Sequence, residues 1–193
     1  MGKLYFYYGT MGASKSAEVI LKYDYFNRLG KKVMLCKALI DDKICPDKYV
    51  TIESRSGLKN TQVIPIGFTG ELPNFDNYDI LIIDECQFLS ENSVKNLRNI
   101  TNCTKTLIFC YGLRTNFRAD LWEGSKFLFA LADTIREITA MCARCCNKSA
   151  VNARLVHGKV TISGELIQHD TRHGGNTTYQ ALCFNCWSTL AEY

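Results

Sequence analysis

Short apolar runs that alternate with segments of helical periodicity are the strongest constraint on the fold of this chain. Runs such as YDILIID are apolar almost throughout, as expected for strands of a parallel sheet that is buried on both faces. Strands separated by helices predict an α/β domain whose mostly parallel sheet is covered on both sides. The expected strands are residues 4–8, 33–40, 62–66, 78–84, 105–111 and 135–139, and the expected helices are residues 16–29, 91–100 and 125–132.

Two stretches do not follow this alternation. Residues 41–61 are polar and show little periodicity, so we expect a long connection there, which could act as a lid. From Met141 onward Cys, Asn, Gly and Thr prevail, which is typical of a loop-rich lobe. A chain of 193 residues is long enough for one α/β domain with a small appendage. We therefore expect a main domain over residues 1–140 and a second lobe over residues 141–193.

The net charge of the chain and the length of its apolar segments limit the kinds of partner it can bind. The formal net charge is +4, and the basic residues are scattered, so a small anionic ligand accounts for this charge as well as nucleic acid does. No segment approaches the roughly 20 apolar residues that cross a bilayer. We expect a cytoplasmic protein without a membrane or nucleic-acid partner, whose cysteines are thiols or metal ligands rather than disulfides.

The octapeptide GTMGASKS lies between the first strand and the first helix, where backbone N–H groups can bind phosphate oxygens. Against the pattern G-x-x-x-x-G-K-[ST], Lys15 is expected to reach the β- and γ-phosphates of ATP, and Ser16 to bind Mg²⁺. Ser14 stands where the pattern has its second glycine. A tight glycine turn with a solvated lysine is the alternative. The expected phosphate-binding residues are Gly9, Thr10, Met11, Gly12, Ala13, Ser14, Lys15 and Ser16.

Two acids stand where the strand YDILIID gives way to ECQF: Asp84 is the last residue of the strand, and Glu85 follows it. Such a position lies at the carboxyl edge of the sheet, where α/β folds bind ligands. We expect Asp84 to hold Mg²⁺, and Glu85 to accept a proton from an attacking hydroxyl. Gln87 is placed with Asp84 among the nucleotide-binding residues. A solvated strand end is the alternative interpretation.

Two Cys-x-x-Cys pairs occur in the second lobe. Cys142 with Cys145, and Cys183 with Cys186, supply the four thiolates of a closed tetrahedral zinc site. Such a site has no open position, which predicts a structural role rather than a catalytic one. Reduced thiols without a metal are the alternative.

The motifs LYFYYG, DECQF and YGLRTNF, followed by the paired cysteines, occur in an order that resembles the type II thymidine kinases of bacteria and phages. The resemblance runs from Leu4 to Trp187. It implies a P-loop, RecA-like core with a small zinc-ribbon lobe whose lasso loop closes over the substrate. It also implies transfer of the γ-phosphoryl group of ATP to the 5′-hydroxyl of thymidine or deoxyuridine, and a homotetramer.

By the same resemblance Glu85 is the general base. Residues 53–57 match a further loop of the family, although an ordinary polar turn would explain them equally. Two departures are Trp122, where a phenylalanine is more usual, and residues 170–173, which are polar where the family has apolar residues. The nucleoside-binding residues that the resemblance implies are Phe88, Leu113, Phe117, Trp122, Tyr179, Asp41, Lys43 and Gly175.

Two other functions fit parts of the sequence. Because Ser14 replaces a glycine of the phosphate loop, the chain could be a nucleotide-binding or regulatory relative with weakened catalysis. A nucleic-acid-dependent ATPase whose zinc ribbon grips a strand is the third hypothesis.

Overall fold

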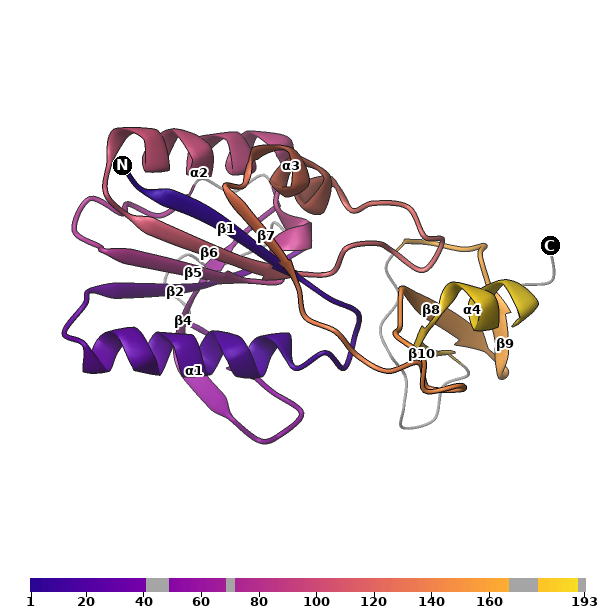
Figure 1. The fold of residues 1–193 in the computed structure, drawn as a ribbon. Coiled ribbons are helices and arrows are strands. Elements are labelled where there is room, and N and C mark those ends of the chain that lie inside the picture. The colour runs from indigo at the N-terminus through magenta and orange to yellow at the C-terminus, as the bar shows by residue number, and fades with distance from the viewer. Residues whose placement is uncertain (41–48, 69–71, 167–176, 191–193) are drawn as a thin grey trace.

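The computed structural model describes residues 1–40, 49–68, 72–166 and 177–190. A seven-stranded sheet in the order β3-β4-β2-β5-β6-β1-β7 forms the larger part (Figure 1). All of its neighbouring strands are parallel except the pair β3 and β4. Its elements are β1 (Lys3–Tyr8), α1 (Lys15–Arg28), β2 (Val33–Ala38), β3 (Val50–Glu53), β4 (Lys59–Ile66), β5 (Ile80–Asp84), the 3₁₀ helix η1 (Cys86–Phe88), α2 (Glu91–Cys103), β6 (Leu107–Gly112), α3 (Glu123–Leu131) and β7 (Thr134–Glu137).

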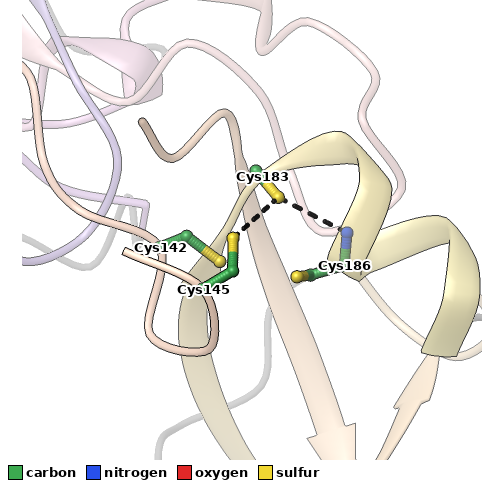
Figure 2. A group of neighbouring side chains, drawn as sticks. All are labelled: Cys142, Cys145, Cys183 and Cys186. Atoms are coloured by element: carbon green, nitrogen blue, oxygen red, sulfur yellow. Dashed lines mark hydrogen bonds between the residues drawn. The ribbon is translucent and has the colours of Figure 1, made fainter. Parts of the chain in front are cut away.

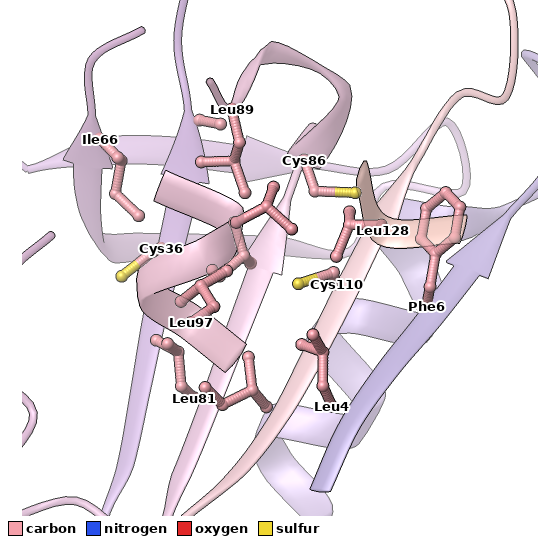
Figure 3. Packing of buried hydrophobic residues seen from close by; sticks show 14 of the residues in the cluster. Leu4, Phe6, Cys36, Ile66, Leu81, Cys86, Leu89, Leu97, Cys110 and Leu128 are labelled. Carbon is pink, nitrogen blue, oxygen red and sulfur yellow. The ribbon is translucent and has the colours of Figure 1, made fainter. Parts of the chain in front are cut away.

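Helices cover both faces of this sheet, α1 on one side and α2 with α3 on the other (Figure 1). On the α1 face Val19 packs in one buried cluster with Leu35 and Ile82. On the opposite face Leu97 and Leu128 pack with sheet residues in the cluster drawn in Figure 3. The predicted mostly parallel sheet flanked by helices is therefore confirmed, and the ends of the expected elements differ from the observed ones by up to three residues.

Strand β6 pairs with both β1 and β5 and so determines how these two strands are aligned along the sheet. Cys110 of β6 pairs with Phe6 of β1 on one side and with Ile83 of β5 on the other. The carboxyl ends of β1 and β5 therefore finish at the same height along the sheet, one strand apart. The loop after β1 and the acids after β5 are brought to a common edge by this pairing.

The prediction of a connection without secondary structure over residues 41–61 is wrong for its second half. Strand β3 and the beginning of β4 form an antiparallel pair there, and β4 starts at Lys59 rather than at residue 62. Ile52 and Val63 are buried against the α1 face, whereas residues between them in sequence are mostly exposed. Between Ile52 and Val63 the chain has no further buried apolar side chain, which gives too little periodicity for the pair to be recognised. Residues 41–48 lie outside the described part of the chain.

The second lobe is also more regular than expected. A three-stranded antiparallel sheet in the order β10-β8-β9 packs with a helix, and none of these elements was located individually from the sequence. Alternate residues of β8, including Val151 and Leu155, pack with Leu182 and Trp187. The large sheet ends with β7 and the small one begins with β8, while the division between residues 140 and 141 stays a prediction. The elements are β8 (Val151–Val156), β9 (Lys159–Thr161), β10 (Thr177–Leu182) and α4 (Phe184–Leu190).

Within the described ranges, no helix has both the length and the apolar character needed to cross a membrane.

Helix α3 packs closely on η1, and Gly124 allows that approach. A Cβ added at Gly124 would lie 2.3 Å from the carbonyl oxygen of Cys86 and 2.8 Å from that of Leu89. We expect Gly124→Ala to lower the free energy of unfolding, measured by urea denaturation, by about 1–3 kcal/mol, since backbone atoms must shift. The exposed Lys126→Ala change on the same helix should stay within about 0.5 kcal/mol of wild type. Equal stability of the two variants would contradict this packing.

Candidate active site

The loop between β1 and α1 folds around the side chain of Lys15. The Lys15 ammonium donates hydrogen bonds to the carbonyl oxygens of Gly9 at 3.2 Å and Thr10 at 2.8 Å. Lys15 is buried, and this burial lowers the pKa of its ammonium, while the nearby carboxylates of Glu85 and Asp84 oppose that shift. The loop thus holds a positive charge at the carboxyl edge of the sheet.

Two positions of this loop have a backbone that glycine adopts most easily, and at a third there is no room for a Cβ. Gly12 has a φ of 83° and Ser14 a φ of 59°, both in the left-handed region. A Cβ at Gly9 would lie 2.4 Å from the carbonyl oxygen of Ile138. A residue with a Cβ in the left-handed region costs roughly 1–2 kcal/mol. Ser14 therefore keeps the conformation that the missing glycine would adopt, at an energetic cost.

Asp84 ends β5 as a buried carboxyl group, 2% exposed. It accepts hydrogen bonds from the backbone N–H of Glu85, at 3.0 Å, and from the side chain of Ser16. Burial, followed by the neighbouring Glu85 carboxylate, raises the pKa of Asp84 to about 6. A carboxylate beside a hydroxyl is a donor set that suits Mg²⁺, whose charge would offset the cost of the buried anion.

Glu85 follows Asp84 in the left-handed conformation, with a φ of 56°. Its carboxylate accepts a hydrogen bond from the Gln87 side-chain amide at 2.6 Å. The oxygen of the same amide accepts from the backbone N–H of Leu113 at 3.0 Å. Gln87 is buried, so it fixes the direction of the Glu85 carboxylate relative to the loop after β6. Gly112 makes room for it, because a Cβ there would lie 2.6 Å from that amide oxygen.

A cavity of about 260 Å³ separates the phosphate loop from the turn between β3 and β4. Arg55 of this turn lies beside Gly12, with a guanidinium nitrogen 3.6 Å from where a Cβ of Gly12 would be. Residues 53–56 thus form a wall of the cavity. The lining residues are Met11, Gly12, Ser14, Lys15, Ser16, Ala17, Glu53, Ser54, Arg55, Ser56, Glu85 and Leu113.

The aromatic residues expected around the nucleoside form two groups. The ring of Phe88 meets that of Trp122 edge to face, with centroids 5.4 Å apart. Phe117 is buried beneath the guanidinium of Arg154, whose central carbon lies 3.6 Å from the ring centroid. Tyr179 belongs to the second group, since its hydroxyl accepts a hydrogen bond from Arg154 at 2.9 Å.

Three of the expected nucleoside-binding residues, Asp41, Lys43 and Gly175, lie outside the described residues.

The four cysteines of the second lobe come together as their spacing predicts (Figure 2). Their sulfur atoms all lie within 4.8 Å of one another, and those of Cys145 and Cys183 are 3.6 Å apart. Sulfurs bound to one tetrahedral zinc ion at about 2.3 Å would be separated by roughly 3.8 Å. The cluster of Cys142, Cys145, Cys183 and Cys186 could therefore hold a zinc ion with little movement.

Sequence reasoning missed the polar residues that join the second lobe to the phosphate loop. The hydroxyls of Thr10 and Ser149 share a hydrogen bond of 2.7 Å. The backbone N–H of Met11 donates to the side-chain oxygen of Asn152 at 2.6 Å. The signal was present in VNARL, where apolar and polar residues alternate as in a strand with two different faces.

Comparison with known proteins gives consistent results along the chain. A family model described as thymidine kinase matches residues 2–187. The chain is 33% identical over 190 residues to the thymidine kinase of Streptococcus agalactiae, covering 95% of both chains. It is 34% identical over 190 residues to that of Lactococcus lactis, again covering 95% of both chains. With the thymidine kinase of Zymomonas mobilis it shares 36% identity over 194 residues, covering 95% of this chain and 94% of the relative.

The left-handed backbone of Ser14 generates a stability prediction. Ser14→Gly should raise the free energy of unfolding by about 0.5–1 kcal/mol in urea denaturation, because relief of strain exceeds the extra flexibility of glycine in the unfolded chain. Ser14→Ala is the matched control, since Ser14 makes no helix-capping hydrogen bond through its side chain and alanine keeps the Cβ. A gain of the same size in both variants would show that strain is not the cause.

The raised pKa of Asp84 generates a pH prediction. Because the pKa of the folded carboxyl group, about 6, lies above its unfolded value near 4, this group favours folding most at low pH, and that contribution is lost between about pH 4 and 6. Without added Mg²⁺, Asp84→Asn should therefore gain about 1–3 kcal/mol over wild type at pH 7.5 and little at pH 4. The exposed Asp76→Asn change is the control. A gain that does not depend on pH would contradict the assignment.

Proposed function

The chain belongs to the thymidine kinase family, and on that premise we propose that it transfers the γ-phosphoryl group of ATP to the 5′-hydroxyl of thymidine or deoxyuridine. The products are the nucleoside monophosphate and ADP. One observation carries the proposal: a single cavity is lined by the Lys15 ammonium from the phosphate loop and by the Glu85 carboxylate from the end of β5. A phosphate-binding cation and a proton acceptor are the two groups that this transfer requires.

Residues of the phosphate loop, 9–16, bind the triphosphate in this proposal. Their backbone N–H groups and the N-terminus of α1 favour phosphate oxygens, and Lys15 balances the charge of the β- and γ-phosphates. Ser16 and Asp84 would hold Mg²⁺, which when bound neutralises charge on the phosphate oxygens. Arg55, on the opposite wall of the cavity, adds a second positive charge near the same oxygens.

Glu85 acts as the general base. Its carboxylate takes the proton of the 5′-hydroxyl as the nucleoside oxygen attacks the γ-phosphorus and the bond to the ADP oxygen breaks. The hydrogen bond from Gln87 supports this role, because it holds the carboxylate in one orientation without supplying a proton-accepting group of its own. In this proposal Gln87 positions the base, and its place among the nucleotide-binding residues stays a prediction.

The nucleoside is bound by residues beyond the acid pair. We propose that Phe88 stacks on the base, which is worth about 1–3 kcal/mol in comparable sites. Leu113, Phe117 and Trp122 enclose it, and Tyr179 contributes from β10. Asp41, Lys43 and Gly175 belong to the same proposal, on the strength of the family resemblance alone.

A structural zinc ion in the second lobe completes the proposed cofactors. Four thiolates close the coordination sphere, so the metal would stabilise the junction of residues 142–145 with the start of α4 and would take no part in the transfer. We further propose a cytoplasmic homotetramer that acts in deoxynucleoside salvage, and a division into a kinase domain over residues 1–140 and a zinc lobe over residues 141–193.

The hypothesis of a catalytically weakened relative rests on Ser14. The conformation of Ser14 supports the kinase instead, because this residue takes the left-handed backbone that a glycine would take and leaves Lys15 in the loop. No observation on the described residues favours a nucleic-acid-dependent ATPase.

The role of Glu85 is tested by the nearly isosteric change Glu85→Gln. We expect kcat for thymidine phosphorylation, followed with labelled ATP, to fall about 100-fold or more, while KM for ATP changes little, because only proton transfer is lost. Glu53→Gln removes another carboxylate from the opposite wall of the same cavity and should reduce kcat far less. Full turnover in Glu85→Gln would refute this assignment. A nucleoside panel assayed with wild type defines the acceptor.

A further inference from the structure

Strand β8 has two buried faces of opposite character. Val151, Ala153 and Leu155 point into the apolar core of the second lobe. Between them lie Asn152, 3% exposed, and Arg154, 1% exposed. Successive side chains of a strand point to opposite sides, so these two polar residues share the face turned away from that core. Buried polar groups are costly unless their partners are fixed, which makes those partners informative.

The Asn152 amide joins two loops of the larger domain. Its oxygen accepts the hydrogen bond from the backbone N–H of Met11, in the phosphate loop, at 2.6 Å. Its nitrogen donates to the carbonyl oxygen of Thr115, in the loop after β6, at 3.4 Å. The neighbouring contact between Thr10 and Ser149 fixes the same end of the phosphate loop. The loop that would bind ATP is thus held from outside its own domain.

Arg154 makes the corresponding contacts on the nucleoside side. Its guanidinium covers the ring of Phe117 and donates to the Tyr179 hydroxyl and, at 3.1 Å, to the carbonyl oxygen of Leu166. Among the ion pairs of the described ranges none includes Arg154, and the contacts described there are with an aromatic face and neutral oxygens. A buried cation satisfied in this way holds its partners in one arrangement.

We propose that Asn152 and Arg154 are positioning residues through which the second lobe fixes the conformation of two substrate-binding loops. Asn152 holds the phosphate loop, and Arg154 holds the loop after β6 that carries Phe117. This inference rests on the proposed function for the identity of the two ligands. Strand β8 then has a role beyond folding of the second lobe. Its apolar face packs beside the cysteine cluster, and its polar face makes both contacts with the substrate-binding loops.

Substitutions at the two positions should affect the binding of different ligands. Asn152→Ala is expected to weaken ATP binding about tenfold and thymidine binding less, since the hydrogen bond to the phosphate loop, 2.6 Å, is much shorter than the one to the loop after β6, 3.4 Å. Arg154→Met keeps an unbranched side chain but removes the guanidinium and its charge, and should weaken thymidine binding about tenfold with ATP binding nearly unchanged. Val151→Ala, on the opposite face of β8, is the matched control and should lower thermal stability without altering either affinity.

The experiment measures dissociation constants of ATP and thymidine separately by calorimetry on the full-length, zinc-loaded variants, with zinc content and melting temperature alongside. Hydrogen exchange at residues 10–13 should rise in Asn152→Ala and not in Arg154→Met. Equal weakening of both ligands in proportion to lost stability would overturn the proposal, as would unchanged affinities. Should either variant fail to fold, Asn152→Ser and Arg154→Lys take its place, with the same expected separation. If wild type binds ATP but no nucleoside, the proposed function fails, whereas the exchange result still decides the role of Asn152.

Discussion

The pairing of β6 with β1 on one side and β5 on the other determines where the chemistry of this protein can occur. Since Cys110 lies opposite both Phe6 and Ile83, the two flanking strands end level with each other. A loop that wraps around Lys15 and a pair of acids at residues 84 and 85 are thereby placed on one edge. Neither feature alone would indicate a phosphoryl transfer; their separation by a single strand does.

Two buried polar side chains then fix the loops at this edge of the sheet. Gln87 ties the Glu85 carboxylate to the loop after β6, and Asn152 ties the phosphate loop to the second lobe. Both are amides, which can donate and accept at once and so can link two segments. This edge of the sheet is accordingly bounded by two parts of the chain with separate buried cores, one in the large sheet and one beside the four cysteines.

Much of this architecture could be predicted from the sequence because buried parallel strands are apolar throughout, and their carboxyl ends collect polar residues. Strand β3 and the first residues of β4 were not predicted, since Ile52 is the buried apolar residue of an otherwise mostly polar stretch that reaches to Gln62. The left-handed backbone of Glu85 could not be foreseen, because glutamate does not favour that region, whereas that of Ser14 was indicated by the glycine it replaces. Arg154 was missed for a different reason: its partners Phe117, Leu166 and Tyr179 come from three other segments of the chain, and a single arginine in a strand is usually exposed.

The most direct test of this account is a structure of the protein with Mg²⁺, a non-hydrolysable ATP analogue and thymidine. The account predicts the triphosphate on the backbone N–H groups of residues 10–16 with its terminal phosphate beside Lys15. It also predicts the 5′-oxygen of thymidine within hydrogen-bonding distance, about 2.6–3.2 Å, of the Glu85 carboxylate. A nucleotide bound elsewhere, or a 5′-oxygen that faces away from Glu85 while both ligands are bound, would contradict it.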